Sequence, residues 1–177
     1  MSSPPTSLTS SFIQRVVVGV GDATSSNNPH VMLSTYALGS CVGVLAYDPV
    51  IRVGGILHMM LPDSAIAPTK AQTQPAMFAN TGLPLFFGGL HGLKVDRLRL
   101  RILVAGGACV LGGADTFKIG ERNVQATLVY LSRNGFAVAK TLVGGTINRT
   151  LHLAIGTGVV TLKTPMGVET FSLAGAI

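Results

Sequence analysis

Residues 42–61, VGVLAYDPVIRVGGILHMML, contain two apolar runs with an Asp-Pro turn between them. Apolar runs of this length that flank turn residues are typical of paired β-strands. We therefore expect an antiparallel hairpin whose strands cover residues 42–47 and 53–61. A four-residue loop over residues 48–51 would join the two strands, and the rest of the fold is expected to form around them.

Two helices are expected outside the hairpin, at residues 83–93 and 121–133, because apolar side chains recur there at helical spacing. Pro84 would lie in the first turn of the first helix, where proline is tolerated. The side chains expected to face the core are, in chain order, Phe86, Leu90 and Leu93, and then Val124, Leu128 and Leu131.

Short apolar runs bounded by glycine and other turn residues predict several further strands. They lie at residues 16–20, 97–104, 136–142, 150–155, 159–163 and 168–173. Residues 21–29 are rich in Ser, Asn and Asp, so we expect a loop there. Because strands outnumber helices, the predicted fold class is α+β, with mixed, mainly antiparallel β-sheets packed with a few helices.

The chain has 177 residues, which is the size of one domain. Residues 1–11 are almost all Ser, Thr and Pro, so we expect a disordered tail followed by a single domain over residues 12–177. Hydrophobic residues make up 47% of the chain and charged residues 11%. This composition excludes an intrinsically disordered protein and a coiled coil.

The composition also bears on location and partners. The longest stretch without a charged side chain, residues 71–93, contains Gln, Pro, Asn, Gly and His, so no membrane-spanning helix is expected. No apolar run follows a charged start, so we expect no signal peptide and a cytoplasmic protein. The net charge of +6 does not identify a partner. Nucleic-acid binding is not expected, since Trp is absent and aromatic residues do not alternate with basic ones.

The cysteines and histidines limit the possible chemistry. In the cytoplasm, Cys41 and Cys109 are expected to be free thiols, with Cys109 acting as a small buried hydrophobe. The other histidines are not at the spacing of a zinc site, so we expect no metal and no cofactor. These histidines are His30, His91 and His152.

The hairpin suggests a specific pairing of a thiol with an imidazole. With a loop over residues 48–51, Cys41 lies directly opposite His58, and both side chains point to the same face of the sheet. An imidazole beside a thiol can take its proton and leave a nucleophilic thiolate. Gly39 and Ser40 precede the cysteine in a turn whose backbone N–H groups could form an oxyanion hole. From these residues alone, ordinary packing of the pair stays open.

Several longer stretches resemble one family. They are the TYALGSC of residues 35–41, the YDP of residues 47–49, the GGILHMMLP of residues 54–62, the FANT of residues 78–81, the GGA of residues 106–108 and the IGERN of residues 119–123. Together they resemble the CheD family of chemoreceptor glutamine deamidases. The resemblance covers roughly residues 15–165.

The resemblance implies a cytoplasmic enzyme that converts Gln side chains of methyl-accepting chemotaxis receptors to Glu, with a possible action on receptor methyl esters. It implies that Cys41 attacks the amide, His58 activates the thiol and Thr35 orients the imidazole. Backbone N–H groups of Cys41 and Ser40 would bind the oxyanion. The implied fold has β/β/α layers like those of other cysteine hydrolases, and the implied partner is a CheC-type phosphatase.

Departures from the family pattern keep two other functions open. Leu142 stands where the family has Asp, and Asn148 stands where it has Gly. One alternative is a binding module with weak or no turnover that partners a CheC-type phosphatase. Another is a cysteine hydrolase that acts on a different amide or ester.

Three arginines alternate with apolar residues in the strand expected over residues 97–104. Arg97, Arg99 and Arg101 would therefore lie on one face of that strand. Such a row is either a solvated sheet edge or a docking surface for an acidic receptor or regulatory protein.

Overall fold

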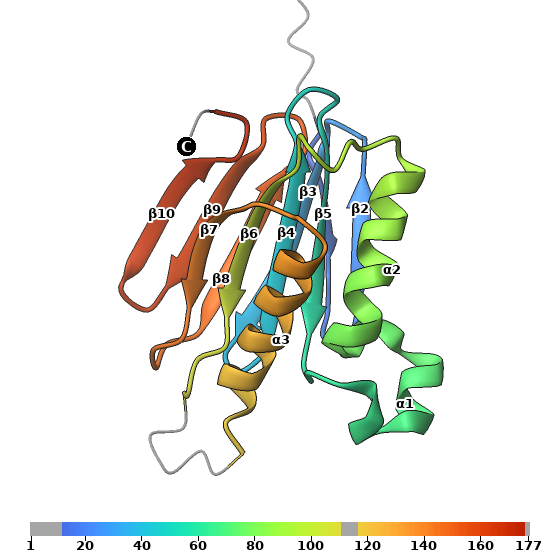
Figure 1. Cartoon of the computed structure of the whole chain (residues 1–177). Coiled ribbons are helices and arrows are strands. Elements are labelled where there is room, and N and C mark those ends of the chain that lie inside the picture. Colours follow the sequence, from blue (N-terminus) through green and yellow to red (C-terminus); the bar gives the residue numbers. More distant parts are fainter. Residues whose placement is uncertain (1–11, 111–116, 176–177) are drawn as a thin grey trace, which may run out of the picture.

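The computed structural model describes residues 12–110 and 117–175 (Figure 1). The tail expected at residues 1–11 lies outside the described residues. The strands are β1 (Gln14–Val17), β2 (Ala23–Ser26), β3 (Val31–Leu38), β4 (Val42–Asp48), β5 (Val53–Met59), β6 (Arg101–Gly106), β7 (Val138–Val143), β8 (Arg149–Ala154), β9 (Val159–Thr164) and β10 (Gly167–Ser172). The helices are η1 (Ser64–Ile66), α1 (Pro68–Thr73), η2 (Pro75–Met77), α2 (Ala79–Gly92) and α3 (Ile119–Arg133).

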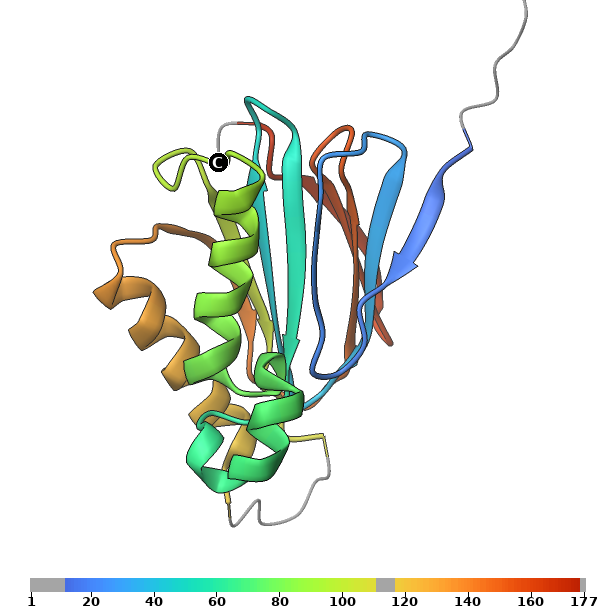
Figure 2. The same cartoon turned by 90° about the vertical axis from the view of Figure 1, so that its right-hand side faces the viewer.

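Within the described residues the strands form two stacked five-stranded sheets. The first sheet has the order β1-β3-β8-β9-β10 and the second β2-β5-β4-β6-β7. β1 with β3 and β6 with β7 are parallel pairs, and the other pairs are antiparallel. Figure 2 shows α2 and α3 on the side of the second sheet that faces away from the first. The layers are therefore β/β/α, and the predicted α+β fold class is confirmed.

Strand alternation divides the core into two clusters. Leu45 of β4 and Ile56 of β5 face the first sheet, where they pack in an inter-sheet cluster. Val44 and Leu57, one residue along on each strand, pack against α2 and α3. Every residue of β4 and β5 is buried because helices cover one face of the hairpin and a sheet covers the other. This burial explains why residues 42–61 read as nearly continuous apolar runs.

The hairpin is present, but its register differs from the predicted one. Asp48 pairs with Val53 and Gly43 pairs with His58. The loop has the expected four residues but covers residues 49–52, because the Asp48 side chain is buried and bonded at the end of β4 rather than exposed in the turn. Cys41 is therefore two residues from the position opposite His58. A shift of two residues keeps the side chains on the same face.

The row of arginines is not formed. β6 begins only at Arg101. The Arg99 guanidinium donates to the Asp48 carboxylate, with an Nη2 to Oδ2 distance of 2.8 Å. Arg97 Nη2 donates to the carbonyl of Asn134 at 2.7 Å. The predicted single face of three arginines is wrong, because the chain turns over residues 97–99 instead of extending.

Both main helices differ from their predicted positions. α2 begins at Ala79, four residues earlier than expected, so Pro84 lies inside the helix and not in its first turn. α3 spans Ile119–Arg133, close to the expected range. Its buried face is turned from the predicted one: Val124 and Leu128 are only partly buried. The fully buried residues of α3 are Gly120, Asn123, Thr127 and Leu131.

The N-terminal region was the least predictable part of the fold. The strand expected to be buried at residues 16–20 is instead the edge strand β1, in which Val17 is 58% exposed. The loop expected at residues 21–29 contains β2, whose sequence ATSS lacks the large side chains that usually mark a strand. β2 forms because it pairs with Gly54–Leu57 of β5.

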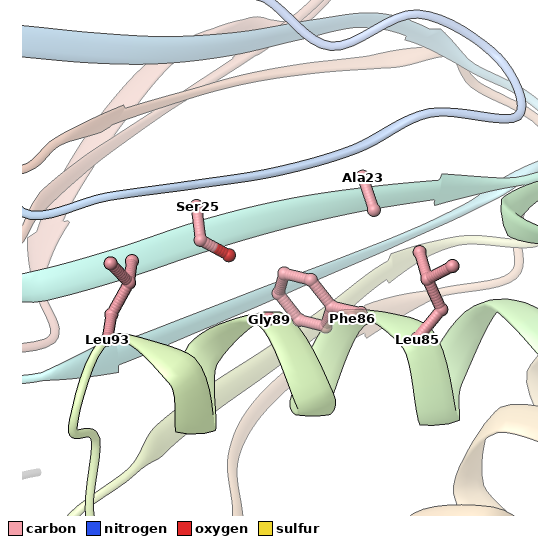
Figure 3. A pocket seen from close by; sticks show the side chains of 6 residues that line it. All are labelled: Ala23, Ser25, Leu85, Phe86, Gly89 and Leu93. Carbon is pink, nitrogen blue, oxygen red and sulfur yellow. The ribbon is translucent and has the colours of Figure 1, made fainter.

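A shallow apolar groove runs between the edge strand β2 and α2 (Figure 3). Phe86 points from α2 toward the strands. A Cβ on Gly55 would lie 2.7 Å from the Phe86 ring, so only glycine lets α2 approach β5 this closely. None of the helices in the described part of the chain has the length and hydrophobicity of a membrane-spanning helix.

Candidate active site

Two of the residues singled out in the sequence, Thr35 and His58, meet at the end of the hairpin that lies opposite its loop. Thr35 lies on β3 of the first sheet and His58 on β5 of the second, and both are almost fully buried, at 0% and 1% exposed. Their side chains meet between the sheets, where Thr35 Oγ1 and His58 Nδ1 are 2.8 Å apart. Thr35 Oγ1 also lies 2.9 Å from the carbonyl oxygen of Val18.

These two distances fix the tautomer of His58. A hydroxyl has one proton, and the Val18 carbonyl can only accept, so the Thr35 hydroxyl donates to Val18. The bond to His58 must then run the other way, with Nδ1–H donating to Thr35 Oγ1. Nε2 is left as the unprotonated nitrogen. Its lone pair is the basic group of the site.

The environment keeps this imidazole neutral. Burial lowers the pKa of His58, opposed in part by the Val18 carbonyl and by the Asp22 carboxylate. His58 Nε2 is itself buried and has no hydrogen-bond partner in the described part of the chain. A neutral imidazole with a free lone pair can accept a proton from a thiol or from water.

Cys41 packs against the inter-sheet cluster that also contains Ile56, two residues before His58 on the same strand face. It is partly exposed, and its carbonyl accepts from Gly107 N–H at 2.8 Å. Burial raises the pKa of the Cys41 thiol. No hydrogen bond joins the thiol to His58 Nε2 in this structure, since Nε2 has no partner in the described residues. The pKa directions favour a neutral thiol and a neutral imidazole at rest.

A strained turn carries the chain from β3 to Cys41. The pairing of β3 with β8 has a bulge between Thr35 and Leu38, and Ala37 adopts the left-handed region with φ of 56°. Gly39 N–H donates to the Ala37 carbonyl at 2.8 Å, so this N–H is not available to an oxyanion. Backbone strain of this kind persists where a site requires it.

A larger residue at Gly39 would require neighbouring side chains to move. A Cβ there would lie 2.8 Å from Asn148 Oδ1 and 3.1 Å from Val110 Cγ2. Asn148 is one of the departures from the family pattern, and its amide therefore lies against the turn before Cys41. The other departure, Leu142, is partly buried and packs against the inter-sheet cluster, where an apolar side chain fits.

Asn123 was not predicted as a site residue. Its side chain is 1% exposed, and Nδ2 donates to the carbonyls of Ser40 at 3.0 Å and Met60 at 2.8 Å. The sequence signal was available, because Asn123 and Thr127 lie four residues apart and precede Leu131 at the same spacing. Two polar residues on the buried face of a helix indicate a specific hydrogen-bonding role.

Comparison with known proteins identifies relatives of this chain. Residues 60–164 match the family model described as CheD chemotactic sensory transduction. A "Probable chemoreceptor glutamine deamidase CheD 1" from Syntrophus aciditrophicus is 41% identical, over 86% of this chain and 95% of its own. A protein of Solibacter usitatus, "Probable chemoreceptor glutamine deamidase CheD", is 42% identical, over 85% and 89%.

A third relative, "Probable chemoreceptor glutamine deamidase CheD 2" from Anaeromyxobacter dehalogenans, is 38% identical over 84% of this chain and 93% of its own. A solved structure of a Neisseria meningitidis protein has a TM-score of 0.40 and 15% identity, over 73% of this chain and 58% of its own. That likeness is too low to carry weight. The family match and the relatives show that this chain belongs to the CheD family.

Proposed function

We propose that this protein is a cytoplasmic deamidase that converts selected Gln side chains of methyl-accepting chemotaxis receptors to Glu. Its relatives carry the name chemoreceptor glutamine deamidase. The observation that carries the proposal is the bond from His58 Nδ1 to Thr35, which leaves Nε2 as a buried base without a partner in the described residues, while Cys41 packs against the inter-sheet cluster on the same side of the hairpin. Residues 12–177 would act as one domain without a cofactor.

The first half of the reaction forms a thioester. Cys41 Sγ attacks the carbonyl carbon of the Gln amide while His58 Nε2 takes the thiol proton. The amide oxygen becomes an oxyanion, which backbone N–H groups of Cys41 and Ser40 stabilise. The carbon–nitrogen bond then breaks, and the imidazolium returns its proton to the departing nitrogen, which leaves as ammonia.

The second half regenerates the enzyme. His58 Nε2 takes a proton from water as the water oxygen attacks the thioester carbon. The carbon–sulfur bond breaks, the imidazolium gives its proton back to Cys41, and the receptor side chain is released as Glu. The net change is one water consumed and one ammonia released.

The resting protonation states suit this sequence. Burial raises the pKa of Cys41 and lowers that of His58, so the proton stays on sulfur until a substrate carbonyl is present. Proton transfer and attack then occur together, with His58 as a general base. Thr35 holds the imidazole in the tautomer whose Nε2 can accept, which is an orienting role.

Peptide mass mapping of a receptor cytoplasmic fragment tests the proposal. Wild-type protein should convert particular Gln residues to Glu, and Cys41→Ala should not. Cys109→Ala is the matched control, because it removes the only other thiol of the chain and should leave the conversion intact. Full conversion by a folded Cys41→Ala variant would exclude the proposed nucleophile.

Two observations favour the second candidate, a CheD-like binding module that partners a CheC-type phosphatase. The Cys41 thiol has a raised pKa, and its bond to Nε2 is not formed. Iodoacetamide alkylation separates the candidates. If His58 Nε2 can take the thiol proton during attack, Cys41 reacts faster than Cys109 near neutral pH, whereas equal slow rates favour the module. A hydrolase for another amide or ester would pass the alkylation test and leave receptor fragments unchanged.

A further inference from the structure

Asn123 joins the two chain segments that carry the proposed nucleophile and base. It lies in the second turn of α3, and its Nδ2 donates to the carbonyl of Ser40, next to Cys41, and to that of Met60, two residues after His58. We propose that Asn123 is a positioning residue that sets the spacing of Cys41 and His58. This inference rests on the proposed function.

The segment before β4 needs such a link because strand pairing stops one residue short of Cys41, whereas His58 is still paired with Gly43. The last paired residues of β4 and β5 are Val42 and Met59. Beyond that pair, the Cys41 carbonyl bonds to Gly107, while Met60 N–H bonds to the Met77 carbonyl. Each segment is thus hydrogen-bonded to a different neighbouring segment. The Asn123 amide links the two segments at the position where the next β4–β5 pair, Cys41 with Met60, would have formed.

The chemistry of the two partners selects this residue type. Both are carbonyl oxygens, so only the NH₂ group of the amide can face them, one N–H to each. Asn123 Oδ1 is left buried and without a partner in the described residues. An apolar side chain would avoid the unpartnered oxygen but would leave the carbonyls of Ser40 and Met60 without this donor.

The helix holds Asn123 independently of the segments it bridges. Thr127 Oγ1 donates to the Asn123 carbonyl at 2.8 Å, which braces the same turn of α3. A Cβ on Gly120 would lie 2.7 Å from the Gly107 carbonyl oxygen, so this end of α3 is packed closely against the chain next to Cys41. A side chain fixed in this way can hold the two segments at one spacing.

The test compares Asn123→Ala and Asn123→Asp with the wild type, and uses Asn134→Asp as the matched control. Asn134 is the C-cap residue of the same helix. Its Nδ2 also donates to a backbone carbonyl, that of Tyr130, at 2.8 Å. Loss of positioning should lower kcat on the order of 10²-fold in both Asn123 variants, with KM little changed. Asn134→Asp should keep the wild-type kcat.

The pH profile separates positioning from general destabilisation. In Asn123→Asp the introduced carboxyl faces two carbonyl oxygens, so its pKa should lie above the ordinary value of about 3.9. When protonated it donates to one carbonyl, and when ionised to neither. The kcat of this variant should therefore fall further as the pH rises through that pKa, which the wild type does not do.

A readout that needs no substrate covers the case in which the proposed function fails. His58→Ala should slow Cys41 alkylation by about tenfold, because Nε2 is no longer there to take the thiol proton as sulfur attacks the reagent. The same change should have little effect in the Asn123→Ala background, because the pair is no longer aligned. Cys109 provides the internal reference rate. Asn123→Ser keeps one hydrogen-bond donor, so His58→Ala should have an intermediate effect on Cys41 alkylation in this background. This variant replaces the other Asn123 variants in the test if they do not fold.

The outcomes distinguish the two proposals. If the wild type deamidates a receptor fragment and folded Asn123 variants match it in kcat and in alkylation coupling, the positioning role is wrong and the proposed function stands. If no fragment is deamidated but the coupling of His58 to Cys41 is lost in the Asn123 variants, the proposed function fails and the positioning role stands.

Discussion

The two ends of the β4–β5 hairpin differ in whether their buried polar groups have hydrogen-bond partners. At the loop end, the top of Figure 1, the fully buried Asp48 carboxylate accepts from the Arg99 guanidinium and from Val50 N–H. At the other end, His58 Nε2 and Asn123 Oδ1 are buried without a partner in the described residues. Satisfied groups stabilise a fold, and unsatisfied ones are retained where a site needs them.

The pKa directions follow the same contrast. Burial by itself would raise the pKa of Asp48, but hydrogen bonds from Arg99, Val50 and Asp96 outweigh it and hold that pKa below its usual range. At the site end burial prevails, and the pKa of His58 is lowered. The loop end therefore keeps its charge, while the site end keeps its imidazole neutral.

The largest expected effect is on activity at the site end. His58→Ala should lower kcat for deamidation by about 10⁴-fold, because the only proposed proton acceptor is lost. Its free energy of unfolding in urea should also fall, since the substitution removes a buried ring and the hydrogen bond from Nδ1 to Thr35. A folded His58→Ala variant with more than a tenth of wild-type kcat would contradict the assigned base.

The reverse pattern is expected at the loop end. Asp48→Ala removes the carboxylate that accepts from Arg99 and from Val50 N–H. The free energy of unfolding should fall by about 1.5 to 3 kcal/mol. Because the Arg99 side chain is partly exposed, water can replace part of the hydrogen bonding that it loses. Its kcat below the melting temperature should equal that of the wild type. A large loss of kcat in this variant would break the contrast between the two ends.

A smaller effect is expected from the orienting hydroxyl. Thr35→Val should lower kcat about tenfold, the equivalent of one hydrogen bond of about 1.4 kcal/mol, and Thr35→Ser should restore it. Ser34→Ala is the control, because Ser34 Oγ lies 2.8 Å from His152 Nδ1 in a buried pair on the opposite face of the same strand. Equal losses of kcat in Thr35→Val and Ser34→Ala would exclude a specific role for Thr35.

The smallest effect is the pH dependence of stability. The pKa of His58 is lower in the folded protein than its unfolded value of about 6.5. Below that pH the unfolded chain therefore binds more protons than the folded protein, and the free energy of unfolding should fall as the pH drops. The contribution of Asp48, whose folded pKa is lowered, is present above about pH 3.9 and is lost only as the pH falls further.

Urea unfolding across this pH range checks both windows. His58→Ala should flatten the slope just below pH 6.5, with a residual slope from His152, whose pKa burial also lowers. Asp48→Asn should change the slope only at more acid pH. A His58→Ala profile that is parallel to the wild type would show that the imidazole titrates alike in the folded and unfolded chain.

The sequence predicted the parts of the fold that depend on local pattern. The hairpin was found because β4 and β5 are buried on both faces, and α3 because its apolar residues recur at helical spacing. The register was wrong because Asp48 reads as a turn residue, while its actual partner, Arg99, is 51 positions away. β2 was missed because pairing with β5 determines it.

The candidate site was predictable to a similar degree. Strand alternation predicts that Cys41 and His58 share one face. Cys41 packs against the inter-sheet cluster on that side, but it lies just before β4 and two residues from the predicted register. The meeting of Thr35 with His58 depends on the stacking of two sheets, which no local pattern encodes; the family resemblance suggested it. Asn123 bridges segments 83 and 63 positions away, so its contacts follow only from the tertiary structure.

The proposed thioester at Cys41 is tested most directly by trapping. A receptor fragment is incubated with the protein in the presence of hydroxylamine, and its peptides are mapped by mass. Wild type and Cys109→Ala should yield a glutamyl hydroxamate at the Gln positions that become Glu without hydroxylamine, and Cys41→Ala should yield none. Conversion to Glu with no hydroxamate at any position would contradict attack by Cys41.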